Sequence, residues 1–173
     1  MKKILKTGGF TRTLTFNKKK LVCGFMMIEV VIVASIITVS ILAAMSVTQK
    51  AVYVSRQSLH VLEASFLLEE GAEVVRIYRD NSWSNISSLN VGTNYYPFFI
   101  NNAWTLSTTP STLGIFTRTV NIASVNRDVS TEDITSSGIN DAGTKLITIT
   151  VSWTEGGIIV NKTLSFYIMD IFS

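Results

Sequence analysis

The 173-residue sequence is poor in the residue types that build catalytic and metal centres. Its one cysteine, Cys23, excludes a CxxC pair and a thiolate cluster, and any Ser/His/Asp set would depend on the one histidine, His60. No Gly-x-x-x-x-Gly-Lys segment is present to cradle a phosphate. The composition indicates a protein that is not an enzyme and needs no cofactor. His60 is expected to lie at the surface or to contact the globular part of the chain, called the head below.

Proline is absent between Phe25 and Arg79, which allows one uninterrupted helix over that stretch. At 1.5 Å per residue it would extend over roughly 80 Å, far more than a bilayer requires. Gly71 is a weak point inside the helix, and Asp80-Asn81-Ser82 is a stop signal. The first half is therefore expected to span a membrane and the second half to carry a globular head.

Charge is absent from Val30–Gln49, and a single carboxylate, Glu29, stands at the head of this apolar run. A lone charge inside a spanning helix costs about 2.5 to 3.5 kcal/mol on insertion scales, so it should have a cationic partner. If the chain is cut between Gly24 and Phe25, the new α-amino group of Phe25 on a neighbouring copy can supply that cation. This pairing predicts an assembly of several chains.

The segment before and around Glu29 resembles the class III signal of type IV pilins and of the pseudopilins of secretion and competence systems. Its residues are Lys18-Lys19-Lys20-Leu21-Val22-Cys23-Gly24-Phe25-Met26-Met27-Ile28-Glu29, followed by the apolar run. The resemblance implies that Gly24 ends a cleaved leader, that Phe25 becomes an N-methylated terminus, and that Glu29 is the assembly carboxylate. Cys23 would be lost with the leader. Met26 and Met27 depart from the residues more usual in the family.

The same resemblance implies the partners and the location of the chain. The partners would be a prepilin peptidase that also methylates the new terminus, other pilin subunits, and an inner-membrane assembly platform. The subunit would span the inner membrane once before assembly and would then stand in a pilus at the cell surface. The implied organisation is a leader over 1–24, a membrane half of the helix over 25–49, an amphipathic half over 50–80, and a head over 81–173.

The net charge of the whole sequence is +3. It is positive because the first 24 residues hold seven of the 15 lysines and arginines and no acid. Basic residues beside a first spanning segment, here Lys18, Lys19 and Lys20, keep that end cytoplasmic. Removal of the leader leaves eight basic against 12 acidic side chains, a net charge of −4. Broad DNA binding is therefore not expected.

Beyond Lys50 the apolar residues recur at steps of three, four or seven, which is typical of an amphipathic helix. They are Val52, Leu59, Leu62 and Phe66, and later Val74 and Ile77, which are again three residues apart. Further on the period becomes two. Ile147, Ile149, Val151 and Trp153 alternate with polar residues, Glu155-Gly156-Gly157 forms a turn, and Val160, Leu164, Phe166 and Ile168 resume the alternation.

This pattern predicts a β-hairpin, with a third strand over 114–122 and a short one over 95–100 that Pro97 weakens. Residues 105–112 and 130–144 are expected to be exposed loops. The predicted fold is α+β, a pilin fold in which a long N-terminal helix packs on an antiparallel sheet of about three to four strands.

Two further segments resemble the V-type minor pilins rather than a bulk subunit. They are Glu69-Glu70-Gly71-Ala72-Glu73-Val74-Val75-Arg76 with Arg79-Asp80-Asn81-Ser82-Trp83, and the strand from Lys145 to Trp153 with its turn. Two alternatives within the membrane interpretation are a secretory signal cut near Ala44-Met45-Ser46 and a boundary acid that snorkels to the headgroups. A pseudopilin role stays open.

A different class of function is a membrane-anchored module that binds DNA or another ligand through a patch such as Arg118, Arg127 and Lys145. The acids of the 128–141 region are expected to form a solvated loop rather than a calcium site, because their spacing is not that of an EF-hand. They are Asp128, Glu132, Asp133 and Asp141. An aromatic cluster either packs the sheet on the helix or forms an exposed patch, and it comprises Tyr95, Tyr96, Phe98, Phe99 and Trp104.

Overall fold

The computed structural model describes Gly9 and residues 22–171, and of residues 22–25 only the backbone. Helix α1 (Val22–Asn81) begins the described chain and is followed by a short helix α2 (Trp83–Ser87) and seven strands. By internal contacts the chain divides into two compact units, one up to Val52 and one from Tyr53 onward. The predicted leader lies for the most part outside the described residues.

Helix α1 ends where the sequence predicts. Asn81 is its last residue, and Ser82 has an extended backbone with φ of −173° and ψ of 136° before α2 begins. In the first unit, the side chains from Met26 to Val52 are all exposed, because no other element of that unit packs on them. The described part contains one helix long and apolar enough to cross a membrane, and it is this one.

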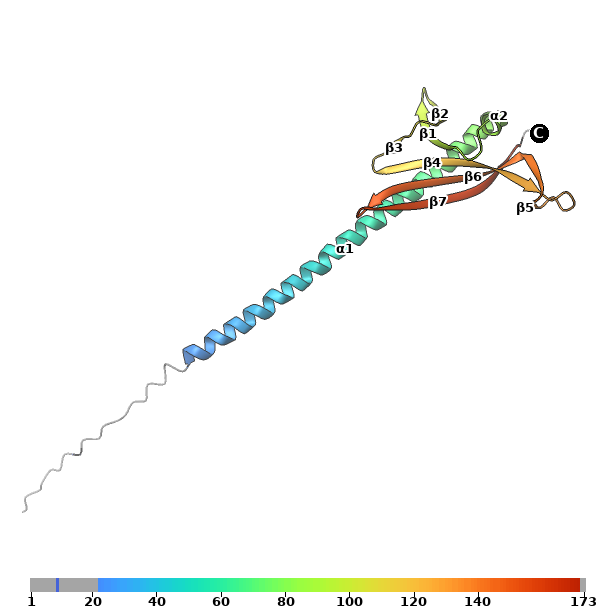
Figure 1. Ribbon diagram of the computed structural model, residues 1–173. Helices are drawn as coiled ribbons and strands as arrows, with labels where there is room; N and C mark the ends of the chain where they lie inside the picture. The colour runs from blue at the N-terminus through green and yellow to red at the C-terminus, as the bar shows by residue number, and fades with distance from the viewer. Residues whose placement is uncertain (1–8, 10–21, 172–173) are drawn as a thin grey trace, which may run out of the picture. The chain divides into compact units, whose positions relative to one another are not determined.

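The second unit is an antiparallel sheet that packs one face against residues 61–78 of α1 (Figure 1). The strands of the main path are β2 (Ala103–Ser107), β1 (Asn94–Ile100), β4 (Phe116–Arg127), β6 (Ile139–Glu155) and β7 (Ile158–Met169), in that spatial order. Two short strands, β3 (Thr112–Leu113) and β5 (Ile134–Thr135), also pair with β4. The α+β layering predicted from the sequence is confirmed.

The predicted hairpin is β6 and β7. Trp153 pairs with Val160, and the turn between the strands places Gly156 and Gly157 at φ of 57° and 84°. Positive φ at both central residues gives a turn whose twist matches the strands, and glycine adopts it without steric cost. The inward residues Ile147, Ile149, Val151 and Trp153 are each at most 3% exposed. They alternate with less buried polar residues, as expected for a sheet covered on one face.

The sheet is larger than predicted. Strand β6 starts at Ile139 and β4 continues to Arg127, so 139–144 belongs to a strand rather than a loop, although Ile139, Asn140 and Ala142 are exposed as predicted. The register shift between Ser124 and Val125 explains why the alternation beyond residue 122 does not indicate a strand, since a bulge moves side chains to the other face. Strand β2 was also expected as loop, although Thr105 to Ser107 pair with β1.

Pro97 lies inside β1 without breaking it. At this position β1 pairs with β2 only, opposite Leu106, whereas β4 pairs with β1 at Asn94 and Tyr95. A proline is accepted where one side of the strand makes no ladder hydrogen bond.

The amphipathic stripe predicted on α1 is not the face that packs on the sheet. Of its six residues only Val74 is buried, whereas Leu59, Leu62 and Phe66 are 52%, 52% and 60% exposed. The helix side of the core instead contains Ala64, Leu68, Ala72 and Val75. These residues recur at steps of three or four as well, but two of them are alanines, which carry little weight in a hydrophobic pattern.

Gly71 explains why small residues occupy the contact face. A Cβ atom at this position would lie 3.1 Å from Cγ2 of Ile149 and 3.3 Å from Cδ of Arg118. The sheet therefore lies close to the helix backbone here. Gly71, predicted as a weak point of the helix, is a site of close packing between the two layers.

Candidate functional site

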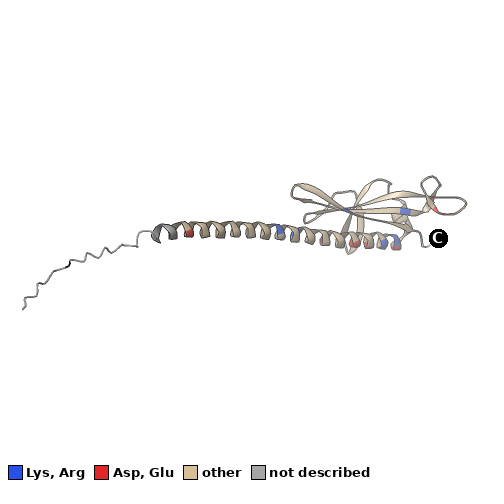
Figure 2. Cartoon of the chain, turned by 90° about the horizontal axis from the view of Figure 1, so that it is seen from below, with Lys and Arg blue, Asp and Glu red and all other residues tan. Residues whose placement is uncertain are grey.

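Glu29 is the ionisable residue of the apolar half of α1. The surrounding side chains on the helix are Met26, Val30, Val33, Ala34 and Ile37. All are exposed, and Figure 2 shows this half of the helix almost free of charged residues. Within the described residues Glu29 makes no salt bridge or side-chain hydrogen bond. Among the described residues, the carboxylate thus has no cationic partner of the kind that an apolar environment would require.

The hydroxyl side chains of the same half are satisfied by the helix itself. All five hydroxyls between residues 26 and 49 donate to a backbone carbonyl three or four residues earlier, over 2.7 to 2.9 Å. They belong to Ser35, Thr38, Ser40, Ser46 and Thr48. A hydroxyl bonded in this way needs no water, so these residues are compatible with a lipid environment. Glu29, the charged residue of this stretch, makes no such bond to the helix within the described residues.

The other residues of the predicted processing site are described less fully. The backbone of Gly24 and Phe25 belongs to α1, and the side chain of Phe25 lies outside the description. Lys18, Lys19 and Lys20 lie outside the described residues. Cleavage after Gly24, methylation of Phe25 and the topology signal of the lysines stay predictions.

In the head, His60 links the helix to the tip of the β6–β7 hairpin. Its Nδ1 lies 2.7 Å from Oε2 of Glu155, and the indole N–H of Trp153 donates to the same oxygen over 3.0 Å. The ring of Phe116 stands edge-on to both His60 and Trp153. The hydrogen bonds from His60 and then Trp153 hold the pKa of Glu155 below its ordinary value. His60 thus makes a head contact.

A second link between helix and sheet is made by Arg118 of β4. Its side chain is 2% exposed and donates from Nη1 to Oε2 of Glu70 over 2.9 Å and to the carbonyl of Leu67 over 3.2 Å. The guanidinium also lies 5.9 Å from the ring centre of Trp104. Its Nε has no hydrogen-bond partner in the described part of the chain. Sequence reasoning missed this pairing because residues 70 and 118 are far apart in the chain and the strand register was unknown.

The basic residues considered for DNA binding are not free to form a patch. Arg118 is buried against Glu70, and Lys145 is 9% exposed. Arg127 donates to Asp141 over 2.6 Å, to Thr144 and to the carbonyl of Glu132. The DNA-binding alternative therefore loses the residues on which it was based.

The acids of the 128–141 region serve the local structure. Asp128 accepts hydrogen bonds from Ser130 and from the backbone N–H of Thr131, which together lower its pKa. Asp141 accepts from Arg127, and its pKa is lowered mainly by hydrogen bonds from Thr144 and Arg127. In the part of the chain that the structure describes, no three His, Cys, Asp or Glu side chains are grouped to hold a metal ion.

The aromatic cluster is divided between the two roles considered for it. Tyr95 is 5% exposed, belongs to the core, and accepts a hydrogen bond from the backbone N–H of Asn90 over 2.9 Å. Phe99 is 57% exposed and stacks edge-on against Trp104 at 5.2 Å between ring centres. Tyr95 thus packs the sheet, while the tip of the β1–β2 hairpin carries an exposed aromatic side chain.

Comparisons with protein-family models, with curated proteins and with solved structures find no match.

Proposed function

We propose that the chain is a prepilin, cut after Gly24 and assembled through the apolar half of α1 as a minor subunit of a type IV pilus. Glu29 is the observation on which this rests. It is an ionisable side chain on a helix surface whose hydroxyls are all self-satisfied, and it has no partner within the described residues. The role of the chain is mechanical rather than catalytic.

A processed neighbour would complete the site. Cleavage gives Phe25 an α-amino group, and this cation on one subunit would pair with Glu29 on the next. Pairing removes the cost of an isolated carboxylate in apolar surroundings, which favours assembly over the monomer in lipid. The basic leader and the outward-facing head fit the membrane orientation set by positive charges beside a first spanning segment.

Mass analysis of the N-terminus of the membrane-extracted protein tests the processing step. The expected product starts at Phe25 and carries one additional methyl group. In Gly24→Ala the uncut chain should accumulate in the membrane. A native product that starts at Met1, or just after a cut near Ala44-Met45-Ser46, would show that the helix is a plain anchor or an ordinary secretory signal.

Substitution of Glu29 tests the assembly step. Glu29→Ala and Glu29→Gln should be cut as the wild type is, yet should enter sheared fibres at least about tenfold less well, equivalent to about 1.4 kcal/mol. Glu69→Ala is the matched control, because Glu69 is an exposed acid of the same helix. Equal incorporation of the Glu29 variants would remove the pairing hypothesis.

A pseudopilin of a secretion or competence system would carry the same processing site. The two roles differ in the product, so the composition of isolated fibres separates them. A pilus subunit copurifies with extended surface fibres, whereas a pseudopilin stays with the envelope.

A further inference from the structure

The tip of the β6–β7 hairpin carries two isoleucines that the head does not bury. Ile158 and Ile159 directly follow the Gly156-Gly157 turn and are 70% and 69% exposed. Successive residues of a strand point to opposite faces, so the tip is apolar on both sides. Apolar side chains exposed together at one place on a surface mark a contact with another protein or with a membrane.

Two contacts hold this tip against the part of α1 where the second unit begins. The hydroxyl of Tyr53 lies 3.7 Å from the position that a Cβ atom of Gly156 would occupy. Nδ1 of His60 lies 2.7 Å from Oε2 of Glu155. Figure 1 shows the end of β6 beside the helix. The turn therefore lies at the level of Tyr53, which is the first residue of the second unit.

The uncharged run of α1 ends a short distance before Tyr53. Residues 30–49 are 20 in number and, as a helix, extend about 30 Å, which is the thickness of the hydrocarbon core of a bilayer. Tyr53 follows Gln49 by four residues, or about 6 Å of helix. The headgroup layer on each side of the core is about 5 to 7 Å thick. If this run spans the membrane, the β6–β7 turn lies within the headgroup layer or directly above it.

The exposed charges at this end of the head are cationic. Lys50 and Arg56 are exposed, and within the described residues neither makes a salt bridge or a side-chain hydrogen bond. Residues 50–62 contain no acid. The carboxylate of Glu155, at the turn itself, is engaged by His60. This end of the head is thus complementary to a negatively charged surface.

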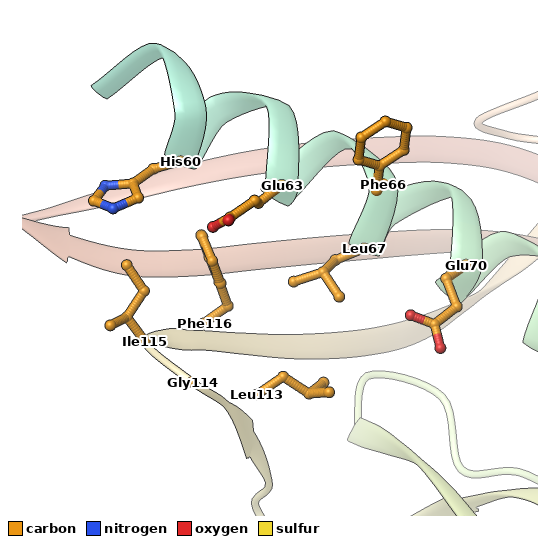
Figure 3. A pocket seen from close by; sticks show the side chains of 9 residues that line it. All are labelled: His60, Glu63, Phe66, Leu67, Glu70, Leu113, Gly114, Ile115 and Phe116. Atoms are coloured by element: carbon orange, nitrogen blue, oxygen red, sulfur yellow. The ribbon is translucent and has the colours of Figure 1, made fainter. Parts of the chain in front are cut away.

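The acids of the helix begin farther from the turn. Figure 3 shows the side chains that line a groove between α1 and the start of β4. Ile115, which is 53% exposed, lies at the same end of this groove as His60. Glu63 and Glu70 project from the helix farther along. The surface near the turn is therefore apolar and cationic, and the acidic surface lies beyond it.

We propose that the tip of the β6–β7 hairpin binds the surface of an anionic phospholipid bilayer, the same bilayer that α1 spans. Ile158 and Ile159 enter the headgroup layer beside Tyr53, since tyrosine is a residue type enriched at this depth. Lys50 and Arg56 contact lipid phosphates. The head then has a second attachment to the membrane besides α1. This inference rests on the membrane-spanning part of the proposed function and does not depend on cleavage or assembly.

Quenching by lipids tests the contact in the full chain. Cys23→Ser removes the native thiol, Ile159→Cys provides a site for a nitrobenzoxadiazole label, and the uncut protein is expressed in a host without a prepilin peptidase. It is reconstituted into vesicles of phosphatidylcholine and phosphatidylglycerol, with and without lipids that carry a nitroxide at the headgroup. Ile139→Cys is the matched control, because Ile139 is a similarly exposed isoleucine at the opposite end of β6 from the turn.

The label at position 159 should be quenched several-fold more strongly than the label at position 139. Equal or weaker quenching at position 159 would show that the hairpin tip has no preferred contact with the bilayer. A label at position 159 whose emission shifts to the blue without being quenched would show that the tip docks on protein, such as a second copy of the chain. Either result overturns the proposal.

Substitution of Arg56 tests the requirement for anionic lipid. In the Ile159→Cys chain, Arg56→Gln should weaken binding of the tip by up to about fivefold, equivalent to about 1 kcal/mol, which lowers the quenching. Arg56→Lys should retain the quenching, because it keeps the charge. In vesicles of phosphatidylcholine alone the two variants should become alike. Equal quenching of both variants in the anionic vesicles overturns the role of the lipid charge.

The outcome is separate from that of the proposed function. Because the uncut chain is used, absence of cleavage at Gly24 in the native host would defeat the proposed function without affecting the quenching at position 159. Conversely, a tip that is not quenched leaves the processing and assembly of the chain to be decided by their own experiments.

Discussion

Residues 26–49 and residues 61–78 belong to the same helix, yet their side chains differ in burial and in hydrogen-bond partners. In the first stretch no side chain is buried, and the hydroxyls bond back to the helix. In the second stretch Ala64, Leu68 and Val75 pack on the sheet, and Glu70 pairs with Arg118. Helical periodicity alone therefore does not identify the face that a helix buries, because the partner surface decides it.

The largest expected contrast lies between two leucines six residues apart. Leu68→Ala should lower the free energy of unfolding of the head by about 2 to 5 kcal/mol, since it leaves a cavity against the sheet. Leu62→Ala should change it by less than about 0.5 kcal/mol, because Leu62 is 52% exposed. The measurement is urea unfolding of the full chain in detergent micelles, followed by tryptophan fluorescence.

Ile37→Ala extends the comparison to the first stretch. Ile37 is exposed and belongs to the other unit, so the unfolding curve of the head should not move. Equal losses in Leu62→Ala and Leu68→Ala would mean that the amphipathic stripe predicted from sequence does pack in the head.

A smaller effect is expected at Gly71, where the sheet lies close to the helix backbone. Gly71→Val should destabilise the head by about 1 to 3 kcal/mol, because its side chain would enter space occupied by Ile149 and Arg118. Ser55→Val places the same side chain on an exposed position of α1 and should have little effect. The same unfolding assay applies, and a stabilised Gly71→Val head would show that the layers can separate at no cost.

The smallest effect concerns pH and the contact between His60 and the hairpin tip. The pKa of Glu155 is held below its ordinary value of 4.5 by the hydrogen bonds from His60 and Trp153. A carboxyl with a lowered pKa stabilises the fold above pH 4.5, and this contribution disappears as the pH falls through the lower, folded pKa. Unfolding free energy measured from pH 6 down to about pH 3 should therefore fall less steeply in Glu155→Gln than in the wild type.

Two other carboxyls with a lowered pKa contribute to the pH profile of both proteins in that comparison. The pKa values of Asp128 and Asp141 are also lowered, but both residues are present in the wild type and in the variant. Glu63→Gln is the control substitution, as Glu63 has no partner within the described residues. Parallel profiles for Glu155→Gln and the wild type would argue against the His60 contact.

The sequence was most informative where one local signal was sufficient. Absence of proline predicted α1, Asp80-Asn81-Ser82 predicted its end, and alternation around Gly156 predicted the β6–β7 hairpin. Each of these depends on neighbours along the chain, which a single sequence contains. The candidate site at Glu29 was proposed in the same way, from one charge in an uncharged run, and it stays a prediction.

What the sequence did not predict depends on contacts between distant segments. The burial of Ala64 and Ala72 in place of Leu62 and Phe66 follows from the close approach of the sheet at Gly71. The pairing of Arg118 with Glu70 requires the strand register, and β6 extends past the bulge because β4 provides an edge for it. Such features depend on the three-dimensional arrangement and leave little periodic trace.

The hydroxyls that bond back to the helix between Ser35 and Thr48 have a consequence for how such a segment exchanges neighbours. Because each carries its own acceptor, the helix can pass from lipid to a protein neighbour without gaining or losing hydrogen bonds along this surface. The apolar side chains favour neither environment, since hydrocarbon and packed protein solvate them alike. Under the proposed assembly, the carboxylate at position 29 is the charged side chain of residues 26–49 that would favour a protein neighbour over lipid, so it can set the direction of the transfer.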